Sequence, residues 1–334
     1  MFAYSYSQYG APDVVTRVEI SKPVPKRDEV LIKVVATTVS AGDWRARSLT
    51  MPTGMGWVGR LVFGVTGPRK PVLGTEFSGV VETVGANVTA YHPGDAVIGF
   101  PGAAFGAHAE YITMSAAGKL VRKPENISFA QATAIPFGAS TAYDFLVNKG
   151  QLRAGERVLV NGASGSTGSA AVQIAKHLGA HVTGVCSGKN ADMVRAIGAD
   201  RVIDYQTQDF TDQDATYDVV VDTVGSAPWS RTQHALRPGG RMLLIAGSTS
   251  DMIFGGLKAR LRGKRLIGGV ATESREILQA VVDLTAAGAF HPVIDRCFAA
   301  DQMIAAHAHV DTGHKKGNVV VAFSALENAE QLAS

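Results

Sequence analysis

The clearest hydrophobic pattern in the chain joins a short apolar run to an amphipathic segment. Three apolar residues starting at Val158 precede a turn of small residues, and Ala171, Ile174, Ala175 and Leu178 then recur at the spacing of one helical face. A continuous apolar run is typical of a parallel strand that is covered on both sides. The pattern therefore predicts a strand, a tight turn and a helix, whose free backbone N–H groups and positive dipole end suit a phosphate group.

Strands and helices are predicted to alternate along the middle of the chain. A helix is expected over 128–149, before this unit, and another over 190–197, after the next strand. Such alternation indicates a right-handed, doubly wound parallel sheet. Beyond the strand at Val158, β-branched runs predict strands at 180–185, 201–204, 217–222, 241–246 and 265–270.

The two ends of the chain share a different pattern of short strands bounded by Gly or Pro. These runs favour an irregular β-barrel or sandwich, and Pro93-Gly94 predicts a type II turn within it. The pattern stops near residue 125 and returns near residue 290, so we expect a discontinuous first domain. Its strands are expected at 30–36, 79–84, 95–100, 110–114, 292–298 and 318–323, with a helix at 301–311.

Residues 45–73 interrupt the strand pattern, because this segment is apolar but punctuated by glycine. A flexible loop of this length could line a substrate cleft. Alternatively, Trp57, Leu61 and Phe63 cap the core of the β-rich domain. The sequence leaves both interpretations open.

Length and composition limit the classes of protein that fit. A chain of 334 residues exceeds what one hydrophobic core usually serves, so two domains are expected. A formal charge of +3 with scattered basic residues disfavours nucleic acid as a partner. No apolar run approaches the length that crosses a bilayer, and the first residues lack the pattern of a signal peptide, so we expect a cytoplasmic protein without a membrane span. Two cysteines exclude a disulfide framework and a four-cysteine zinc site.

The turn after Val158 fits a dinucleotide-binding pattern. Aligned with G-x-G-x-x-G it supplies Ala163, Gly165 and Gly168, so alanine replaces the first glycine. The surrounding strand and helix support this interpretation, although a loop that only packs helix against strand has the same pattern. The residues expected around the pyrophosphate are Gly162, Ala163, Gly165, Ser166, Thr167 and Gly168, and the Ser166 hydroxyl either reaches the pyrophosphate or narrows its approach.

The end of the second predicted strand bears on the choice of cofactor. NAD-binding proteins commonly place an acid there to bind the ribose 2′-hydroxyl. This chain instead continues from the strand as Ser187-Gly188-Lys189, without a carboxylate. Lys189 and the Ser187 hydroxyl predict a 2′-phosphate, and therefore NADPH. The alternative is that Lys189 is a solvated side chain at the start of a helix.

Further short motifs extend along nearly the whole chain, at 73–85, 93–97, 161–165, 178–180, 198–205 and 222–225. Together they resemble the medium-chain dehydrogenase/reductase superfamily, in its zinc-independent quinone oxidoreductase-like branch. The resemblance implies an α/β fold with a discontinuous GroES-like β-rich catalytic domain and a Rossmann domain inserted in it. On this basis we predict the catalytic domain at 1–127 and 290–334 and the NADP-binding Rossmann domain at 128–289, with cofactor and substrate between them.

The same resemblance implies where individual residues lie along the cofactor. Ser187, Lys189 and Tyr205 would surround the adenosine 2′-phosphate. Val224 and Gly225 would lie beside the adenosine, and Thr141, Gly247, Ser248 and Asn318 beside the nicotinamide half.

Departures from the zinc-dependent members of the superfamily point to the chemistry. Where those enzymes place a catalytic cysteine and a histidine, this chain has Ser40 and Thr75, neither of which is a plausible zinc ligand. We therefore predict no metal site. Ser40, Asp43 and Thr75 remain candidate catalytic residues, although Asp43 could instead cap a helix that starts at Trp44.

Without a Lewis acid, hydride transfer favours an acceptor that is already electron-poor, such as a quinone or an α,β-unsaturated carbonyl. Some relatives have a tyrosine where this chain has Arg45. Arg45 or Arg47 could bind a substrate oxygen or form surface salt bridges. His307 and His309, near the end of a predicted helix, are expected to be solvated rather than ligands.

Two other functions stay open. An enoyl-thioester reductase would need a basic rim for an acyl carrier, for which Arg60, Arg69 and Lys70 are candidates. A non-catalytic NADPH-binding or interaction protein would keep the fold without turnover. For any of these functions the resemblance also implies a homodimer, in which residues 265–270 could pair edge to edge.

Overall fold

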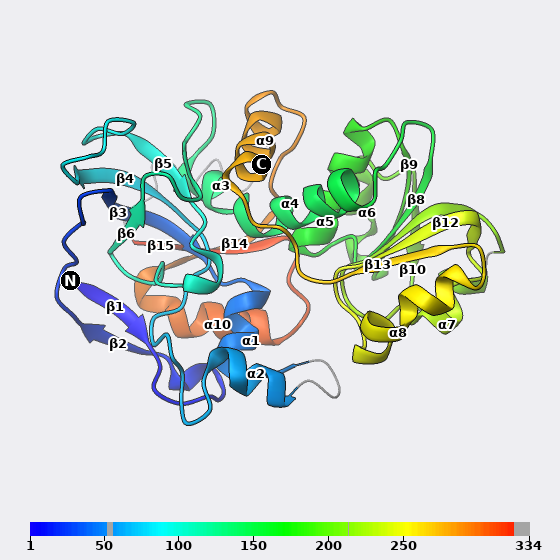
Figure 1. The fold of residues 1–334 in the computed structure, drawn as a ribbon, viewed down its shortest axis with the longest axis horizontal. Coiled ribbons are helices and arrows are strands. Elements are labelled where there is room, and N and C mark those ends of the chain that lie inside the picture. Colours follow the sequence, from blue (N-terminus) through cyan, green and yellow to red (C-terminus); the bar gives the residue numbers. More distant parts are fainter. Residues whose placement is uncertain (52–55, 213, 324–334) are drawn as a thin grey trace.

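The computed structural model describes residues 1–51, 56–212 and 214–323, and it divides them into two lobes that each contain a β-sheet (Figure 1). Residues from both ends of the chain build the left lobe in this view, and the middle of the chain builds the right lobe. Among the described residues, no helix combines the length and the apolar character that crossing a bilayer requires. The two lobes correspond to the β-rich and Rossmann parts that the sequence predicts.

The β-rich lobe is organised around a seven-stranded sheet. Strand β15 pairs antiparallel with β3, and β14 pairs with β15, so the last described strands complete a sheet that the first hundred residues begin. At the predicted turn, Asp95 N donates to His92 O at 3.1 Å and Gly94 has φ +95°, as a type II turn requires. The strands are β1 (Phe2–Ser5), β2 (Thr16–Glu19), β3 (Glu29–Thr38), β4 (Phe77–Val84), β5 (Ala96–Gly99), β6 (Tyr111–Ser115), β7 (Leu120–Arg122), β14 (Ile294–Ala299) and β15 (Asn318–Ala322).

The Rossmann lobe contains a six-stranded parallel sheet in the order β10-β9-β8-β11-β12-β13. The order reverses between β8 and β11, and the carboxyl ends of strands at such a reversal form a crevice that binds ligands. Buried aliphatic side chains cover both faces of the sheet, as the continuous apolar runs predict. The strands are β8 (Arg157–Asn161), β9 (His181–Cys186), β10 (Arg201–Asp204), β11 (Tyr217–Asp222), β12 (Leu236–Leu244) and β13 (Arg265–Gly268).

Helices cover the sheets and connect the lobes. The longer ones are α1 (Ala41–Ser48), α2 (Gly56–Phe63), α3 (Phe129–Thr133), α4 (Pro136–Tyr143), α5 (Ser166–His177), α6 (Ala191–Ala196), α7 (Trp229–Thr232), α8 (Thr249–Arg260), α9 (Arg275–Ala286) and α10 (Met303–Asp311). Shorter 3₁₀ turns are η1 (Pro12–Val14), η2 (Gly102–Ala104), η4 (Gly188–Asn190), η5 (Phe210–Asp212) and η6 (Ala300–Gln302), and η3 (Asp144–Lys149) is a π-helical turn.

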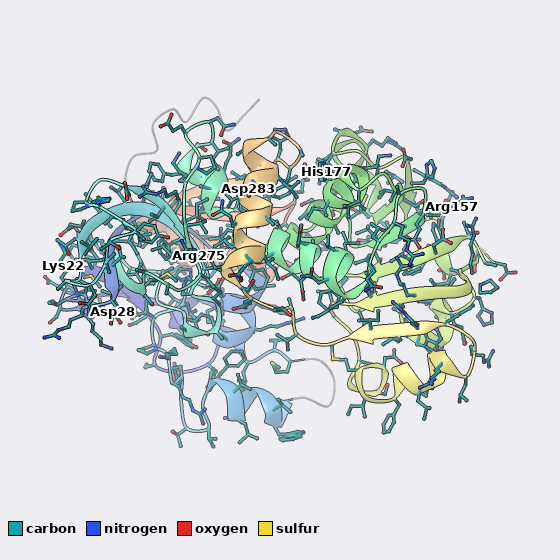
Figure 2. All side chains as sticks on the ribbon, turned by 45° about the horizontal axis from the view of Figure 1, so that its top comes forward. Lys22, Asp28, Arg157, His177, Arg275 and Asp283 are labelled. Atoms are coloured by element: carbon teal, nitrogen blue, oxygen red, sulfur yellow. The ribbon has the colours of Figure 1, made fainter. Side chains whose placement is uncertain are left out.

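Helix α9 lies between the lobes and fastens one to the other (Figure 2). Its Arg275 donates to the Tyr91 hydroxyl at 3.2 Å, and Asn126 donates to Ala286 O at 2.9 Å. Lys119 forms an ion pair with Glu273, just before the helix. These contacts join the Rossmann lobe to the β-rich lobe on the side opposite α2.

Two expectations about local structure need correction. The helix predicted over 128–149 is three pieces, because Pro136 has no N–H to continue a helix and instead begins α4. Residues 45–73 are partly helical, since they include the end of α1 and all of α2.

Within the segment 45–73, only part of the capping interpretation is right. Phe63 packs against the buried cluster of Ala46, Leu73 and Phe105, but Trp57 is 67% exposed and Leu61 is 53% exposed. Residues 52–55 of this segment lie outside the described residues.

Candidate functional site

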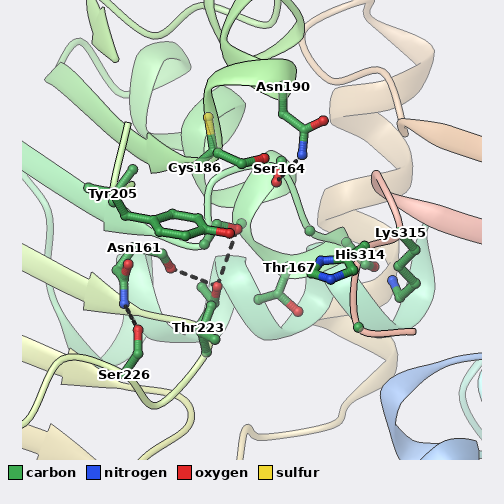
Figure 3. A pocket seen from close by; sticks show the side chains of 18 of the residues that line it. Asn161, Ser164, Thr167, Cys186, Asn190, Tyr205, Thr223, Ser226, His314 and Lys315 are labelled. Carbon is green, nitrogen blue, oxygen red and sulfur yellow. Dashed lines mark hydrogen bonds between the residues drawn. The ribbon is translucent and has the colours of Figure 1, made fainter. Parts of the chain in front are cut away.

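A pocket of about 670 Å³ lies between the lobes, at the crevice formed by the strand order of the Rossmann sheet (Figure 3). Helix α1 of the β-rich lobe and Phe137 of α4 line one end. The turn between β8 and α5 lines the middle, and the residues after β9, β10 and β11 line the other end. Of the predicted site residues, the lining includes Ser40, Gly162, Gly165, Ser166, Thr167, Gly168, Ser187, Lys189, Tyr205, Val224 and Asn318.

The nucleotide turn, which we define as residues 162–168, has the geometry of a phosphate cradle. Gly162 has φ +81°, and a Cβ at Gly168 would lie only 2.0 Å from Gly162 O, so both positions need glycine. The first N–H groups of a helix have no partner within it, and the N-cap residue of α5 is Gly165, which has no side chain to cap them. These N–H groups and the helix dipole suit an anionic group at the start of α5.

The nucleotide turn is held in place by the C-terminal segment of the β-rich lobe. Gly317 N donates to Ser164 O at 2.8 Å, and Ser166 Oγ donates to Asn318 Oδ1 at 2.6 Å. Asn318 Nδ2 in turn donates to Val293 O at 3.0 Å. In this structure the Ser166 hydroxyl is therefore engaged with Asn318 and does not point toward the position expected for the pyrophosphate.

A buried carboxylate organises the loop after β11. Asp222 is fully buried, and its oxygens accept from the backbone N–H groups of Val224, Gly225 and Ala227 at 2.9–3.1 Å. Asn161 at the end of β8 also donates to Asp222, at 2.9 Å. These bonds fix the loop that presents Val224 to the pocket.

The end of the pocket near β9 carries the residues expected around a 2′-phosphate. Ser187, Lys189 and Tyr205 all line it, and Figure 3 shows the Tyr205 ring reaching across the pocket between Cys186 and Thr223. Arg231 also lines this end, where it forms an ion pair with Asp209. Two basic side chains thus reach this end of the pocket.

As the sequence shows, no acid stands at the end of β9, but the fold brings one close to it from another strand. The neighbouring strand β10 ends at Asp204, whose Oδ2 lies 2.5 Å from where a Cβ at Gly188 would be. The sequence motif did not reveal this carboxylate, because it comes from the adjacent strand and not from the end of β9. Glycine at position 188 leaves room for it.

Ser40, Asp43 and Thr75, which we call the hydroxyl wall, come together at the opposite end of the pocket. Ser40 Oγ lies 3.0 Å from Thr75 Oγ1 and donates to Asp43 Oδ2 at 2.6 Å. Asp43 Oδ1 accepts from Gly74 N at 2.8 Å. Ser40 alone of the three lines the pocket, and Asp43 and Thr75 are buried behind it.

The hydroxyl wall is also the beginning of α1. Ser40 is the N-cap, accepting from Gly42 N and Asp43 N, while Asp43 accepts from Ser40 N in a capping box. The expectation that Asp43 caps a helix starting at Trp44 is therefore wrong, because α1 begins three residues earlier. The pattern Ser-x-x-Asp could have identified this cap in the sequence.

Glu76 lies behind the hydroxyl wall and is completely enclosed. Its carboxylate accepts from the Thr38 hydroxyl and, at 2.6 Å, from Phe137 N. Burial raises the pKa of Glu76 to about 8, although these hydrogen bonds act in the opposite direction. Glu76 thus ties β3 to the start of α4, whose Phe137 lines the pocket.

Lys315 brings a cation to the same region from the segment before β15. Its ammonium group donates to Gly317 O, and the side chain lines the pocket together with His314, whose ring Figure 3 shows between Thr167 and Lys315. Burial lowers the pKa of Lys315 to about 8, and the carboxylates of Glu76 and Asp295 partly offset this effect.

Several predicted site residues lie outside the lining of this pocket. Ala163 is fully buried under the nucleotide turn, and the Thr141 hydroxyl donates to Phe137 O at 2.7 Å within α4. Gly225 lies against Gly247, and Ser248 is the N-cap of α8. The roles of these residues toward a cofactor stay predictions.

The expectation of solvated histidines is wrong for His307, and His309 is only partly exposed. His307 is fully buried on the inner face of α10, where its ring packs edge-on against His108 at 5.5 Å, and burial lowers its pKa well below the usual value. His309 Nε2 lies 2.6 Å from Asp295 Oδ2. Arg47 is likewise buried, in an ion pair with Asp311, and does not bind in the pocket.

The sequence analysis missed several lining residues. Ser164 and Asn190 adjoin motifs that were recognised, and Asn190 Nδ2 donates to Ser164 Oγ at 3.1 Å. Arg231, His314 and Lys315 reach the pocket only through the tertiary fold and have no local signal. Among the described residues, no group of three or more His, Cys, Asp or Glu side chains could hold a metal ion.

Comparison with known proteins agrees with this architecture. Residues 26–125 match the family described as alcohol dehydrogenase GroES-like domain, and residues 197–321 match the family described as zinc-binding dehydrogenase. A 2-methylene-furan-3-one reductase of Solanum lycopersicum is 32% identical over 96% of this chain and 79% of its own length. An NADPH-dependent alkenal/one oxidoreductase of Arabidopsis thaliana, a chloroplast protein, is 30% identical with the same coverage.

The solved structure of the quinone oxidoreductase from Coxiella burnetii is similar over the whole fold. It superimposes with a TM-score of 0.85 and 27% identity, covering 97% of this chain and 99% of its own. The pairing of a GroES-like domain with a Rossmann sheet, the nucleotide turn and these similarities agree with one another. The chain therefore belongs to the medium-chain dehydrogenase/reductase superfamily, in its quinone oxidoreductase-like branch.

Proposed function

We propose that this protein is a reductase that uses NADPH to transfer hydride to quinones or α,β-unsaturated carbonyls without a catalytic zinc ion. One observation carries the proposal: the nucleotide turn opens into the same pocket as Ser40, whose hydroxyl bonds Thr75 where zinc-dependent members have metal ligands. The relatives reported above are named for quinone, alkenal/one and furanone substrates, and all these acceptors are electron-poor.

The residues of the pocket fit a nicotinamide dinucleotide. The glycine cradle and the uncapped start of α5 suit its pyrophosphate, and the loop held by Asp222 suits its adenosine. When bound, the reduced cofactor supplies the hydride. The protein's part is to orient the acceptor between α1 and Phe137 and to exclude water.

The choice of NADPH over NADH rests on the β9 end of the pocket. Lys189 is exposed and has no ion-pair partner within the described chain, so its charge is available to a phosphate. Ser187 and Arg231 line the same space. Asp209 also lines this space and opposes an anion there, but its carboxylate is paired with Arg231.

The hydroxyl wall is the protein group best placed to act on the acceptor oxygen. Reduction of a quinone or an enone needs one hydride and at least one proton. Because Ser40 donates to the buried Asp43, its orientation is fixed, and the second hydroxyl of Thr75 stands 3.0 Å behind it. To bind an acceptor oxygen, Ser40 would turn its single hydroxyl hydrogen from Asp43 into the pocket, while water supplies the proton.

The direct test mixes the purified protein with NADPH and a panel of quinones, enones, short enoyl thioesters and simple alcohols, and follows the absorbance of the cofactor. We expect oxidation of NADPH with quinones or enones in the presence of a chelator. Turnover only with alcohols and added zinc would overturn the proposal. Faster turnover of enoyl thioesters than of free enones would make it a thioester reductase, and tight binding without any turnover would make it a non-catalytic binder.

We further propose that the protein forms a homodimer through β13. This strand is the edge of the six-stranded sheet, and Arg265 and Gly268 on it are exposed. A second copy could pair its own β13 antiparallel and continue the sheet. Light scattering on the purified protein tests this, and a monomer at micromolar concentration would contradict it.

A further inference from the structure

Helix α8 exposes an unusual set of large apolar side chains. Ile253, Phe254, Leu257 and Leu261 are 57–79% exposed, and we call these four residues the α8 stripe. At 3.6 residues per turn their positions span about 100° of the helix surface. The opposite face is the buried one, where Met252 and Ala259 pack against the core of the Rossmann lobe. The stripe therefore points directly away from the protein.

Basic side chains flank the α8 stripe on both sides. Helical geometry places Arg260 next to Ile253 at one margin and Lys258 next to Phe254 at the other. Arg262 and Arg265 follow, and all four basic residues are exposed. Within the described part of the chain none of them has an ion-pair partner. Residues 252–272 contain five basic residues and no acidic one.

We propose that α8 docks this protein onto the surface of a membrane that carries anionic lipids. An apolar stripe bordered by Lys and Arg is the pattern of a helix that lies in the plane of the interface. The apolar side chains enter the boundary between head groups and acyl chains, while the long basic side chains extend to the phosphates. Residues 252–272 carry only positive charges, which complement the negative charge of an anionic lipid surface.

This inference does not depend on the proposed activity, but the two are compatible. A stripe of four large apolar residues on one helix is a patch that soluble monomers rarely leave uncovered. The proposed dimer through β13 would place two copies of α8 near one another, because α8 packs directly on that strand through Gly255 and Leu266. Two helices on one assembly would strengthen binding to a bilayer.

The test is flotation of the full-length protein with vesicles of phosphatidylcholine, with and without phosphatidylglycerol. We expect binding to the anionic vesicles to be at least about tenfold tighter than to the neutral ones and to weaken as salt is added. Phe254→Glu/Leu257→Glu should reduce binding at least about tenfold, since the apolar contact is lost. Lys258→Gln/Arg260→Gln should reduce it about tenfold and weaken the salt dependence, since three of the five basic residues remain.

Matched controls separate this effect from a general change of surface. Ile20→Glu/Val24→Glu alters two exposed apolar residues of the other lobe, and Arg153→Gln/Arg157→Gln removes two exposed charges outside residues 252–272 (Figure 2 labels Arg157). Both should bind vesicles as the wild type does. All variants should retain the circular dichroism spectrum and the NADPH turnover of the wild type in solution.

Three results would overturn the proposal. The first is equal or absent binding of the wild type to both kinds of vesicle. The second is unchanged binding of the Phe254→Glu/Leu257→Glu variant. The third is a wild-type dimer that this variant converts to a monomer without any effect on vesicles, because α8 would then be a subunit interface.

Discussion

The nucleotide turn and the hydroxyl wall face each other across one pocket, but they are built in opposite ways. The turn is a contiguous stretch of seven residues whose function resides in its backbone, with glycines at 162 and 168 where side chains would collide. The hydroxyl wall joins Ser40 to Thr75, 35 positions away, through side-chain hydrogen bonds. One half of this site is therefore specified by local sequence, and the other half depends on the packing of distant strands.

For the same reason, the nucleotide turn and the hydroxyl wall should tolerate side-chain substitutions to different degrees. The nucleotide turn is anchored through backbone bonds to β9 and to Gly317, so most single side-chain changes leave it intact. The hydroxyl wall depends on a few buried polar groups, and removing one leaves its partner without a hydrogen bond. Substitutions should therefore separate the two halves.

The largest effect is expected at the nucleotide turn, from Gly168→Ala. The new Cβ would lie 2.0 Å from Gly162 O, so the turn must shift. We expect NADPH to bind more than about tenfold more weakly and the free energy of unfolding to fall by about 1–3 kcal/mol. Titration of cofactor fluorescence and urea unfolding measure both. The control Gly256→Ala meets only Leu266 O, at 3.8 Å. It should leave NADPH affinity unchanged and should not lower the free energy of unfolding, because alanine favours a helix more than glycine does. Wild-type affinity in Gly168→Ala would refute a backbone-built site.

The second prediction concerns the selectivity for NADPH over NADH on the cofactor side of the pocket. Ser187→Ala/Lys189→Ala should raise the KM for NADPH about ten- to a hundredfold, since charge-assisted hydrogen bonds to the 2′-phosphate are lost. The KM for NADH should not change. Arg195→Ala removes a nearby cation that pairs with Asp192, and it should leave both values unchanged. If the wild type used NADH as well as NADPH, or if the double variant kept its affinity, the cofactor assignment would be wrong.

The third prediction examines the hydroxyl wall. Ser40→Ala removes both the N-cap of α1 and the hydroxyl in the pocket, so we expect the free energy of unfolding to fall by about 1 kcal/mol and kcat to decrease. Ser40→Thr keeps the oxygen and should retain most of both. Ser274→Ala removes the N-cap of α9 away from the pocket, so it should lose similar stability without losing turnover. Equal kcat in Ser40→Ala and Ser274→Ala would show that the hydroxyl only caps the helix.

The fourth prediction concerns the pH dependence of stability. The folded-state pKa of Glu76 is raised to about 8, so the folded protein holds a proton there that the unfolded chain releases near pH 4.5. Its contribution to stability is therefore complete below about pH 4.5 and lost as the pH rises toward 8. Glu76→Gln cannot titrate, so the stability of the wild type relative to this variant should fall over that window. Urea unfolding at several pH values measures it, and a constant difference would contradict the raised pKa.

Much of the fold could be predicted from the sequence. The continuous apolar runs predicted the strands of the Rossmann sheet. A strand that is covered on both faces can be identified from its own residues alone. The return of the chain to the first sheet at β14 and β15 was also predictable, from the return of the short-strand pattern. The division of 128–149 at Pro136 was missed, although proline is a local signal. The exact limits of the domains stay a prediction.

The site was less predictable. Glycines, Ser187 and Lys189 could be placed because they follow strands whose ends meet at one edge of the sheet. Asp209, Arg231 and Lys315 could not, since each reaches the pocket from a segment that is distant in sequence. His307 shows the same limit, because only the packing of α10 on the β-rich lobe makes it buried.

By itself the sequence determined the periodicity of the strands and helices, the glycine cradle and the serine and threonine in place of metal ligands. These features depend on single residues and their near neighbours, through φ values, side-chain size and hydrogen-bonding chemistry. The tertiary structure decided how the two halves of the pocket meet. It joined Ser166 to Asn318 across 152 positions and enclosed Glu76 among β3, α4 and Lys315, because contacts between distant segments and the burial of charge arise only when the lobes close around one another.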